Sequence, residues 1–361
     1  MDRREFLFTT GGAAVAAASP AAAEPPEASA EPTATRSGAM VLRLSLPWGD
    51  TVQGPGDSAL RLARRFEAMT SGRYRVEITG EDGSDGDADL LHGPIHDFTP
   101  LHPGYAYFAG LPGSAGLSAP DLARWIAVGG GQSLWDDLAG ELGWKPLLAG
   151  HGGEAPPLWS REPITGLGSL SGRKVSAPGF GAEVARALGA ETQPSSFLQD
   201  GMAFRGAAAA LADGTVDAVE AGDLATSLAL GLPAVARHAT GNGFNAHGTA
   251  FALHVRRSVW ESLPDADQVI LAAATSEEFH LSLAEARAHA RVARQVLEER
   301  FGIRFAPWPA DMAGAIERVA EATIAYAAGH DARARRIDQS YTAFRSMFTE
   351  PKAGRQWPPV A

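Results

Sequence analysis

The chain has 361 residues, of which 45% are hydrophobic and 20% charged, with a formal net charge of −11 and no cysteine. This length and composition are sufficient for two domains, each with a core of its own. The negative charge argues against nucleic acid or an anionic membrane surface as the main partner. Without cysteine the chain has no disulfide framework, no thiolate zinc site and no cysteine nucleophile.

The N-terminus has the pattern of an export signal. Arg3 and Arg4 precede a weakly apolar run and the small-residue sequence at 21–23, as in a twin-arginine signal peptide with its cleavage site. The run is too short and too rich in Gly and Ala for a transmembrane helix. We therefore predict a signal peptide over residues 1–23, a disordered linker over 24–39, and a mature protein that is periplasmic after export by the twin-arginine route.

The first ordered elements follow a β-α-β pattern. Residues 41–46 and Tyr74–Thr79 alternate apolar and polar side chains as strands do, and residues 58–69 between them have helical spacing. Such a unit is expected to be right-handed with parallel strands.

Two later stretches place polar groups at the end of a strand. Residues 170–188 are predicted to form a short strand at 174–177, a Pro-Gly turn, and a helix that begins at Phe180. Residues 214–220 form a tight turn, a strand and a final carboxylate at Glu220. Open α/β sheets bind small ligands where strand ends meet helix N-termini. We interpret these two strand ends as the floor of a ligand cleft.

The C-terminal third is predicted to be mainly helical. An alternating run at 247–256 is the best candidate for a strand that crosses between domains. Apolar residues then recur every three or four positions in three helices, at 279–301, 311–327 and 335–348. The stripe of the last helix is aromatic, and it can either pack in the core or dock on a partner subunit.

Motifs for catalysis are missing. No Gly-x-Ser-x-Gly elbow and no phosphate-binding P-loop occurs. The stretch from Gly179 to Val184 resembles a dinucleotide fingerprint, but Val184 stands in place of its third glycine. We therefore predict that the protein is not an enzyme. Three histidines, at positions 92, 96 and 102, could instead bind zinc together with Asp97, although Pro94 keeps the first two off a common helix.

Seven stretches carry a resemblance to a known family. They lie in order at 106–112, 129–138, 159–164, 170–175, 214–220, 248–251 with 260–264, and 340–345. Together they resemble a solute-binding protein of a tripartite ATP-independent periplasmic (TRAP) transporter, in the subgroup that binds 2-oxoacids and similar carboxylates.

The resemblance implies a two-lobed α/β periplasmic binding protein, type II-like, with hinge-crossing strands and long C-terminal helices. Lobe I would comprise 40–157 with 252–308, lobe II 158–251, and the C-terminal helices 309–350. The protein would capture a small organic ligand, carboxylate-like, for the membrane subunits of a TRAP transporter. It would not bind nucleic acid, and a homodimer through the terminal helices is possible.

The chain departs from the family pattern at the ligand site. The arginine that usually holds the ligand carboxylate by a bidentate pair corresponds to Ser176 here. A glutamine that contacts a bound cation in this subgroup corresponds to Ala155. Glu220 matches the acidic cation ligand of the family, but Ala221 replaces the aromatic residue that follows it. His96 takes the place of an expected tyrosine.

These comparisons lead to a predicted site with apolar walls and a few polar contacts. The wall residues are Trp159, Phe180 and Phe244, with core packing as the alternative for each. The polar residues are Arg161, Ser176, Glu220 and His96, and Glu220 could also hold a bound cation. For Arg161 an interlobe salt bridge is the alternative. Two other functions stay open: a periplasmic metal-binding protein that uses His92, His96 and His102, and a ligand-poor interaction or sensor subunit.

Overall fold

The computed structural model describes residues 38–46, 54–79, 88–153, 155–193, 206–245 and 247–349. All of them belong to one compact unit, Gly38–Ala361. The predicted signal peptide and all but the last two residues of the predicted linker lie outside the described residues. Among the helices that the structure describes, none combines the length and the apolar character needed to cross a membrane.

The first of two sheets has five strands in the order β2-β1-β3-β10-β4. Their bounds are Met40–Ser45 (β1), Tyr74–Thr79 (β2), Leu90–Pro94 (β3), Trp144–His151 (β4) and Ala250–Arg256 (β10). Strands β1, β2 and β3 are parallel, and β10 runs antiparallel to both β3 and β4. The predicted β-α-β opening is therefore present, and the predicted crossing strand, β10, is inserted between two strands from early in the chain.

The second sheet has six strands in the order β11-β9-β5-β8-β6-β7. Their bounds are Leu158–Ser160 (β5), Lys174–Ser176 (β6), Glu191–Gln193 (β7), Ala218–Glu220 (β8), His238–Thr240 (β9) and Arg304–Ala306 (β11). Strand β11 pairs with β9 in this sheet, although the sequence interpretation assigned 252–308 to the other lobe. The remaining lobe boundaries stay a prediction.

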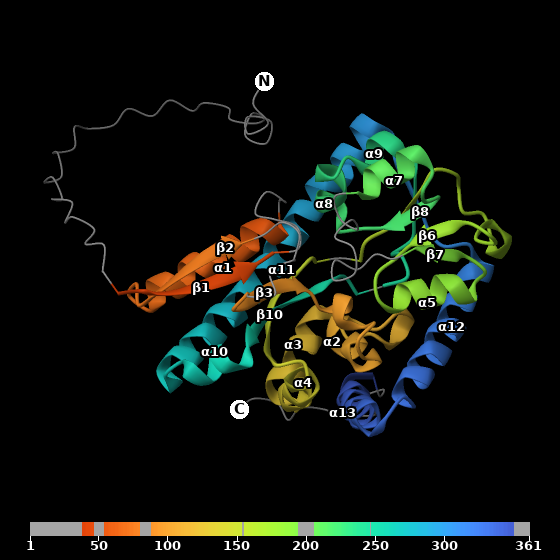
Figure 1. Cartoon of the computed structure of the whole chain (residues 1–361). Coiled ribbons are helices and arrows are strands. Elements are labelled where there is room, and N and C mark those ends of the chain that lie inside the picture. Colours follow the sequence, from red (N-terminus) through yellow and green to blue (C-terminus); the bar gives the residue numbers. More distant parts are fainter. Residues whose placement is uncertain are drawn as a thin grey trace, which may run out of the picture. The chain divides into compact units, whose positions relative to one another are not determined.

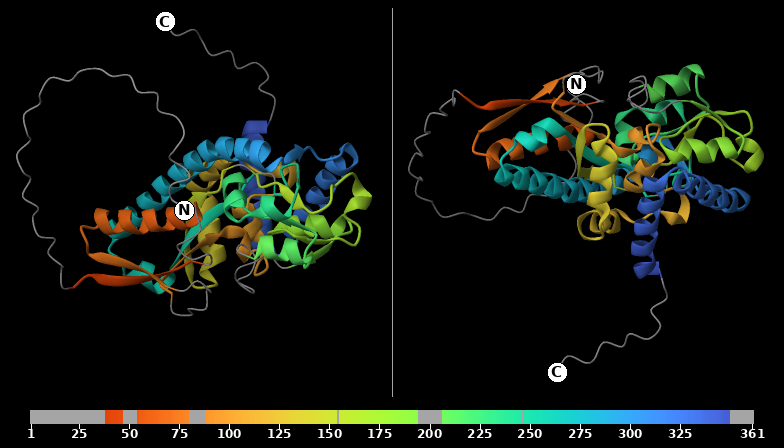
Figure 2. Two further views of the ribbon diagram at one scale, coloured as in Figure 1. Left: turned by 90° about the horizontal axis from the view of Figure 1, so that it is seen from above. Right: turned by 60° about the horizontal axis from the view of Figure 1, so that its bottom comes forward.

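Helices surround both sheets (Figures 1 and 2). Their bounds are Pro55–Met69 (α1), Ala106–Ala109 (α2), Ala119–Val128 (α3), Gly131–Gly140 (α4), Phe180–Ala187 (α5), Ala207–Asp213 (α7), Leu224–Ala229 (α8), Leu232–Val235 (α9), Arg257–Ser262 (α10), Asp265–Phe301 (α11), Ala310–Ala328 (α12) and Ala332–Thr349 (α13). Short 3-10 turns lie at Ile95–Phe98 (η1), Pro103–Tyr105 (η2), Gly113–Ala115 (η3) and Leu167–Ser169 (η4).

Helix α11 connects the two halves of the protein. It has 37 residues and contacts α1 and β4 of the first half and α8 of the second, and it crosses from one half to the other in Figure 1. The sequence predicted only its second part, from residue 279. The first part was missed because polar residues, among them Asp267, Thr275 and Glu278, occupy buried positions and interrupt the apolar stripe on which the prediction relied.

The two C-terminal helices pack on different halves. Met312 and Ile316 of α12 lie in a core with Leu158 of β5 and Val175 of β6. The aromatic stripe of α13 is buried within its own chain, where the Tyr341 hydroxyl accepts a hydrogen bond of 2.7 Å from the backbone N–H of Leu117. This burial favours core packing over docking of the stripe on a partner subunit.

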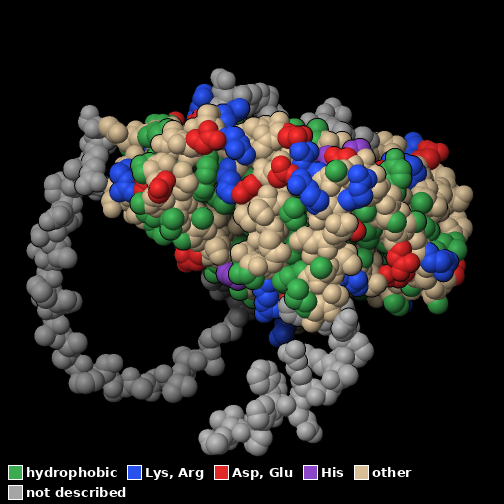
Figure 3. Space-filling model, turned by 90° about the horizontal axis from the view of Figure 1, so that it is seen from below, with side chains coloured by type: hydrophobic (Ala, Val, Ile, Leu, Met, Phe, Trp, Pro, Cys, Tyr) green, Lys and Arg blue, Asp and Glu red, His purple; other side chains and the backbone are tan. Residues whose placement is uncertain are grey.

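Charged side chains of both signs are interspersed on the face of the protein shown in Figure 3. Many of them form local ion pairs, such as Arg124 with Asp121 on α3 and Lys145 with Asp136. Exposed pairs of this kind contribute roughly 0–1 kcal/mol each. The stability of the fold therefore comes mainly from the apolar cores between sheets and helices.

Candidate functional site

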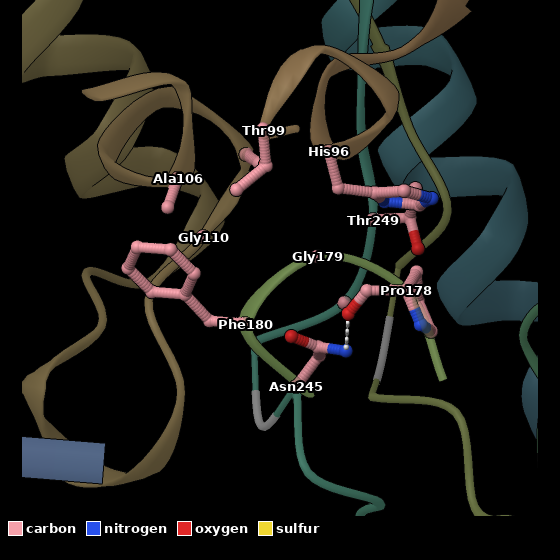
Figure 4. Close-up of a pocket in the computed structure, with 11 residues that line it drawn as sticks. His96, Thr99, Ala106, Gly110, Pro178, Gly179, Phe180, Asn245 and Thr249 are labelled. Atoms are coloured by element: carbon pink, nitrogen blue, oxygen red, sulfur yellow. Dashed lines mark hydrogen bonds between the residues drawn. The ribbon is translucent and has the colours of Figure 1, made fainter. Parts of the chain in front are cut away.

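A small cavity lies where the turn between β6 and α5 meets elements of the first half. Pro178, Gly179 and Phe180 approach it from the second half (Figure 4). The other lining residues are His96, Thr99, Ala106, Ala109, Gly110, Asn245, Gly248 and Thr249. The enclosed space is about 10 Å³, which is about what a single water molecule needs. A ligand of several atoms therefore enters only if the two halves move apart.

The contact between the halves at this cavity is tight because Gly179 has no side chain. Its φ of 53° lies in the left-handed region that favours glycine. A Cβ added at Gly179 would lie 3.1 Å from the Cβ of His96 and 3.7 Å from the hydroxyl of Thr99. Glycine at this position thus allows the first turn of α5 to approach η1 closely.

A hydrogen-bond network behind the cavity fixes the loop that carries Asn245. The carboxylate of Glu220, at the end of β8, accepts bonds from the backbone N–H groups of Phe244 at 2.8 Å and Asn245 at 3.1 Å. The side-chain Nδ2 of Asn245 donates to the carbonyl oxygen of Pro178 at 3.0 Å. This network ties the end of β8, the Asn245 loop and the β6–α5 turn together beside the cavity.

Burial determines the charge states around the cavity. It raises the pKa of Glu220 to about 7, against the opposing effect of the hydrogen bonds from Phe244 and Asn245. Burial also lowers the pKa of His96 to about 3, although 16% of its side chain stays exposed. His96 is therefore neutral at pH 7, and none of the described lining residues is a lysine or an arginine.

Two of the predicted site residues, His96 and Phe180, line the cavity. Glu220 does not line the cavity itself. Its carboxylate accepts a hydrogen bond from the backbone N–H of the lining residue Asn245. Ser176 is buried at the end of β6, two residues before the lining residue Pro178, and does not line the cavity itself. The end of β6, which we interpreted as the cleft floor, is thus next to the cavity. The turn that follows β6 faces the cavity, whereas Ser176, the last residue of the strand, does not.

The other two wall candidates pack elsewhere. Trp159 is fully buried in β5, and its Nε1 donates to Ser227 Oγ at 3.0 Å on the side of the sheet that faces α8. Phe244 is fully buried against Trp308, with ring centroids 5.3 Å apart. Neither lines the cavity, so a direct ligand contact for these two side chains stays a prediction that the geometry does not favour.

Arg161 lies on the surface. It forms an ion pair with Asp217 inside the second half, and the two residues border a surface depression of about 350 Å³ with Glu162 and Arg173. Because 39% of its side chain is exposed and it does not line the cavity, Arg161 is not placed to hold a ligand there.

The three candidate zinc ligands do not converge. The ring of His92 is buried next to Phe251, at 6.1 Å between centroids. His96 Nε2 lies 3.5 Å from Asp97, and His102 Nε2 lies 3.1 Å from Asp331. Within the described part of the chain, no group of three or more His, Cys, Asp or Glu side chains is arranged to hold a metal ion. The metal-binding alternative therefore has no structural support.

Sequence reasoning missed the polar residues that line the cavity from outside the regular elements. Asn245 and Thr249 lie in the segment before β10, and Thr99 directly follows η1. Two signals were available: the stretch 248–251, which contains Thr249, and an asparagine within the glycine-rich stretch that precedes the predicted crossing strand. A segment that joins two domains is a common place for ligand contacts.

Two α/β halves joined by crossing segments, with a small cavity between them, define the class of two-lobed ligand-binding proteins. Residues 55–328 match the family model of the bacterial extracellular solute-binding protein, family 7. The chain belongs to this family.

Relatives with described ligands support the same assignment. A monocarboxylate 2-oxoacid-binding periplasmic protein of Nostoc is 24% identical over 96% of this chain and 95% of its own length. A TRAP periplasmic solute-binding protein of Pseudoalteromonas atlantica, solved with sodium and pyruvate, has a TM-score of 0.78 at 22% identity over 86% of this chain and 94% of its own. A TRAP solute-binding protein of Bordetella bronchiseptica, a dimer with calcium and picolinate, has a TM-score of 0.77 at 22% identity over 86% and 92%.

These matches confirm the resemblance and the two-lobed α/β fold expected from the sequence. Members of the family are solute-binding receptors. The roles of individual site residues stay predictions.

Proposed function

We propose that this protein is a periplasmic receptor that captures a small carboxylate-type solute and delivers it to the membrane subunits of a TRAP transporter. The observation that carries the proposal is the cavity between the halves, where the β6–α5 turn and Asn245 face His96 and Thr99. The ligands in the names of the relatives are small acids, and a ligand of that kind would enter when the two halves move apart. The N-terminal pattern supports export by the twin-arginine route.

A bound cation is not included in the proposal. Relatives were solved with sodium or calcium, and Glu220 corresponds in sequence to the acidic ligand of such an ion. Both oxygens of Glu220 already accept backbone hydrogen bonds. Near Glu220 the described chain offers no second or third His, Asp or Glu side chain arranged to share a metal ion with it.

Thermal-shift measurements with a panel of small acids test the proposal. The full mature chain is heated with pyruvate, lactate, pyroglutamate and picolinate, with glucose and lysine as controls. A ligand present at a hundred times its Kd stabilises the folded state by about 2.7 kcal/mol, which corresponds to a clear rise of the melting temperature.

The proposal predicts such a rise with at least one acid and none with glucose or lysine. A melting temperature that no acid changes would instead favour the ligand-poor interaction subunit. Repeating the panel in the presence of a chelator tests the cation separately, and we expect the same shifts.

A further inference from the structure

The side-chain amide of Asn245 has a fixed orientation. Its Nδ2 lies 3.0 Å from the carbonyl oxygen of Pro178, which can only accept a hydrogen bond. The carbonyl Oδ1 therefore points away from Pro178, toward the side of Phe180 (Figure 4).

The network behind the cavity holds this orientation in place. Glu220 accepts the backbone N–H of Asn245, and Pro178 also accepts the N–H of Gly181 at 3.0 Å. A rotation of the amide by half a turn would bring Oδ1 against the carbonyl oxygen of Pro178. Asn245 therefore presents its carbonyl Oδ1, a hydrogen-bond acceptor, on the side of Phe180 (Figure 4).

The rest of the described lining does not offset this acceptor with a positive charge. His96 is neutral, and the side chains of Thr99 and Thr249 are uncharged hydroxyls. A carbonyl or carboxylate oxygen of a ligand placed against Oδ1 would leave two acceptors facing each other without a proton between them. A hydroxyl or an N–H at the same place would complete the hydrogen bond.

We propose that the cavity selects small acids that present an O–H or N–H donor to Asn245 Oδ1, such as 2-hydroxy acids or lactam acids, over 2-oxoacids of the same size. This inference rests on the proposed function and specifies its ligand class. Leaving a buried acceptor unpaired costs enough to change an affinity roughly ten- to a hundredfold. We expect a discrimination of that size between lactate and pyruvate, which share charge and carbon number and differ in this one group.

Titration calorimetry on the full mature chain tests the inference. The measured quantity is the ratio of the Kd for pyruvate to the Kd for lactate, taken with the better lactate enantiomer. The wild-type ratio is expected to be ten or more. Asn245→Leu, which keeps the size of the side chain and removes both polar groups, should bring the ratio close to one. Gln295→Leu, which makes the same exchange of an amide for leucine on the exposed surface of α11, is the matched control and should keep the wild-type ratio.

The possible outcomes separate the two proposals. A wild-type protein that binds pyruvate as tightly as lactate overturns the inference and leaves the receptor function intact, and this result does not depend on whether the variant folds. A preference for lactate that persists in a folded Asn245→Leu variant overturns the role of Asn245. Failure of wild type to bind any of the four acids of the thermal-shift panel, picolinate included, overturns the receptor proposal and the inference together.

Discussion

The free energy of unfolding is expected to fall by about 4 kcal/mol between pH 7 and pH 5, because three histidines are buried in neutral form. His92, His151 and His254 have at most 3% exposure, and burial is the main cause that lowers their pKa values to about 4, 3 and 3. The unfolded chain binds protons on these rings at a pKa near 6.5. Their stabilising contribution is therefore complete above that pH and is lost as the pH falls toward the folded-state values.

The magnitude follows from the proton balance. Each of these three fully buried rings lowers the free energy of unfolding by about 2 kcal/mol between pH 7 and pH 5, or about 6 kcal/mol together. His96 adds less to this loss, because 16% of its side chain is exposed to solvent. Glu220 acts in the opposite direction, because burial raises its pKa to about 7 in the folded state. As the pH falls from 7 to 5, the folded protein binds this proton and the unfolded chain does not. The free energy of unfolding therefore gains about 2 kcal/mol from Glu220 over the same interval. Since domains are stable by about 5–15 kcal/mol, this net loss is large.

Urea unfolding at a series of pH values measures this loss, and one variant isolates a single ring. Both ring nitrogens of His254 lack a hydrogen bond to any described residue, and the ring stacks on Phe98 at 4.1 Å between centroids. His254→Leu should remove about a third of the histidine contribution. The exposed His280 serves as the control, and His280→Gln should leave the pH slope unchanged. A free energy of unfolding that is equal at pH 5 and pH 7 would contradict the burial argument.

Removing Arg61 is expected to destabilise the protein by about 3 kcal/mol or more, because it leaves the buried carboxylate of Glu278 short of its main partner. Glu278 on α11 is 0% exposed, and its carboxylate accepts hydrogen bonds from Arg61 Nη2 at 2.6 Å and from Arg61 Nε at 2.9 Å. Ser58 Oγ donates to the same carboxylate at 2.7 Å. The network joins α1 to the helix that connects the halves.

Denaturant unfolding of matched variants separates the charge effect from the loss of packing. Arg61→Ala should lose the full amount. The double variant Arg61→Met with Glu278→Met should lose less, because it removes the buried carboxylate together with its main partner. Arg65, which also contacts Glu278 at 3.3 Å, keeps its pair with Glu277. Arg257→Ala, which breaks an exposed pair with Glu261 on α10, should change stability by less than about 1 kcal/mol. Equal losses for Arg61→Ala and Arg257→Ala would contradict the assigned role of burial.

Local sequence patterns were sufficient for most of the regular elements. Strand β1, strand β2 and the start of α5 at Phe180 all follow from alternation, helical spacing and the Pro-Gly turn within a few residues. The short strand β11 was missed because three residues carry too little pattern. The first part of α11 was missed because the partner of Glu278 is Arg61, 217 residues away in the chain, and no local rule reveals such a pair.

The site was predicted less completely than the fold because it depends on distant contacts. The strand end at Ser176 and the carboxylate of Glu220 were recognised from local order, and both lie next to the cavity. Trp159 was a reasonable wall candidate by residue type. Trp159 pairs with Val219 of β8 and Ala239 of β9, and these pairings place its side chain in the core beside α8 instead. The role of Asn245 depends on Pro178, 67 residues earlier.

The most direct test of whether a small acid binds in the cavity between the halves is the affinity of a variant that carries a methyl group at position 179. Gly179→Ala would place a Cβ into the cavity and against His96 at 3.1 Å. Gly172→Ala is the matched control, because Gly172 also has a positive φ, of 69°, and a Cβ there meets nothing within 4 Å. Titration calorimetry with the tightest-binding acid should show an affinity at least tenfold lower for Gly179→Ala and unchanged for Gly172→Ala. Wild-type affinity in a folded Gly179→Ala variant would place the ligand site elsewhere.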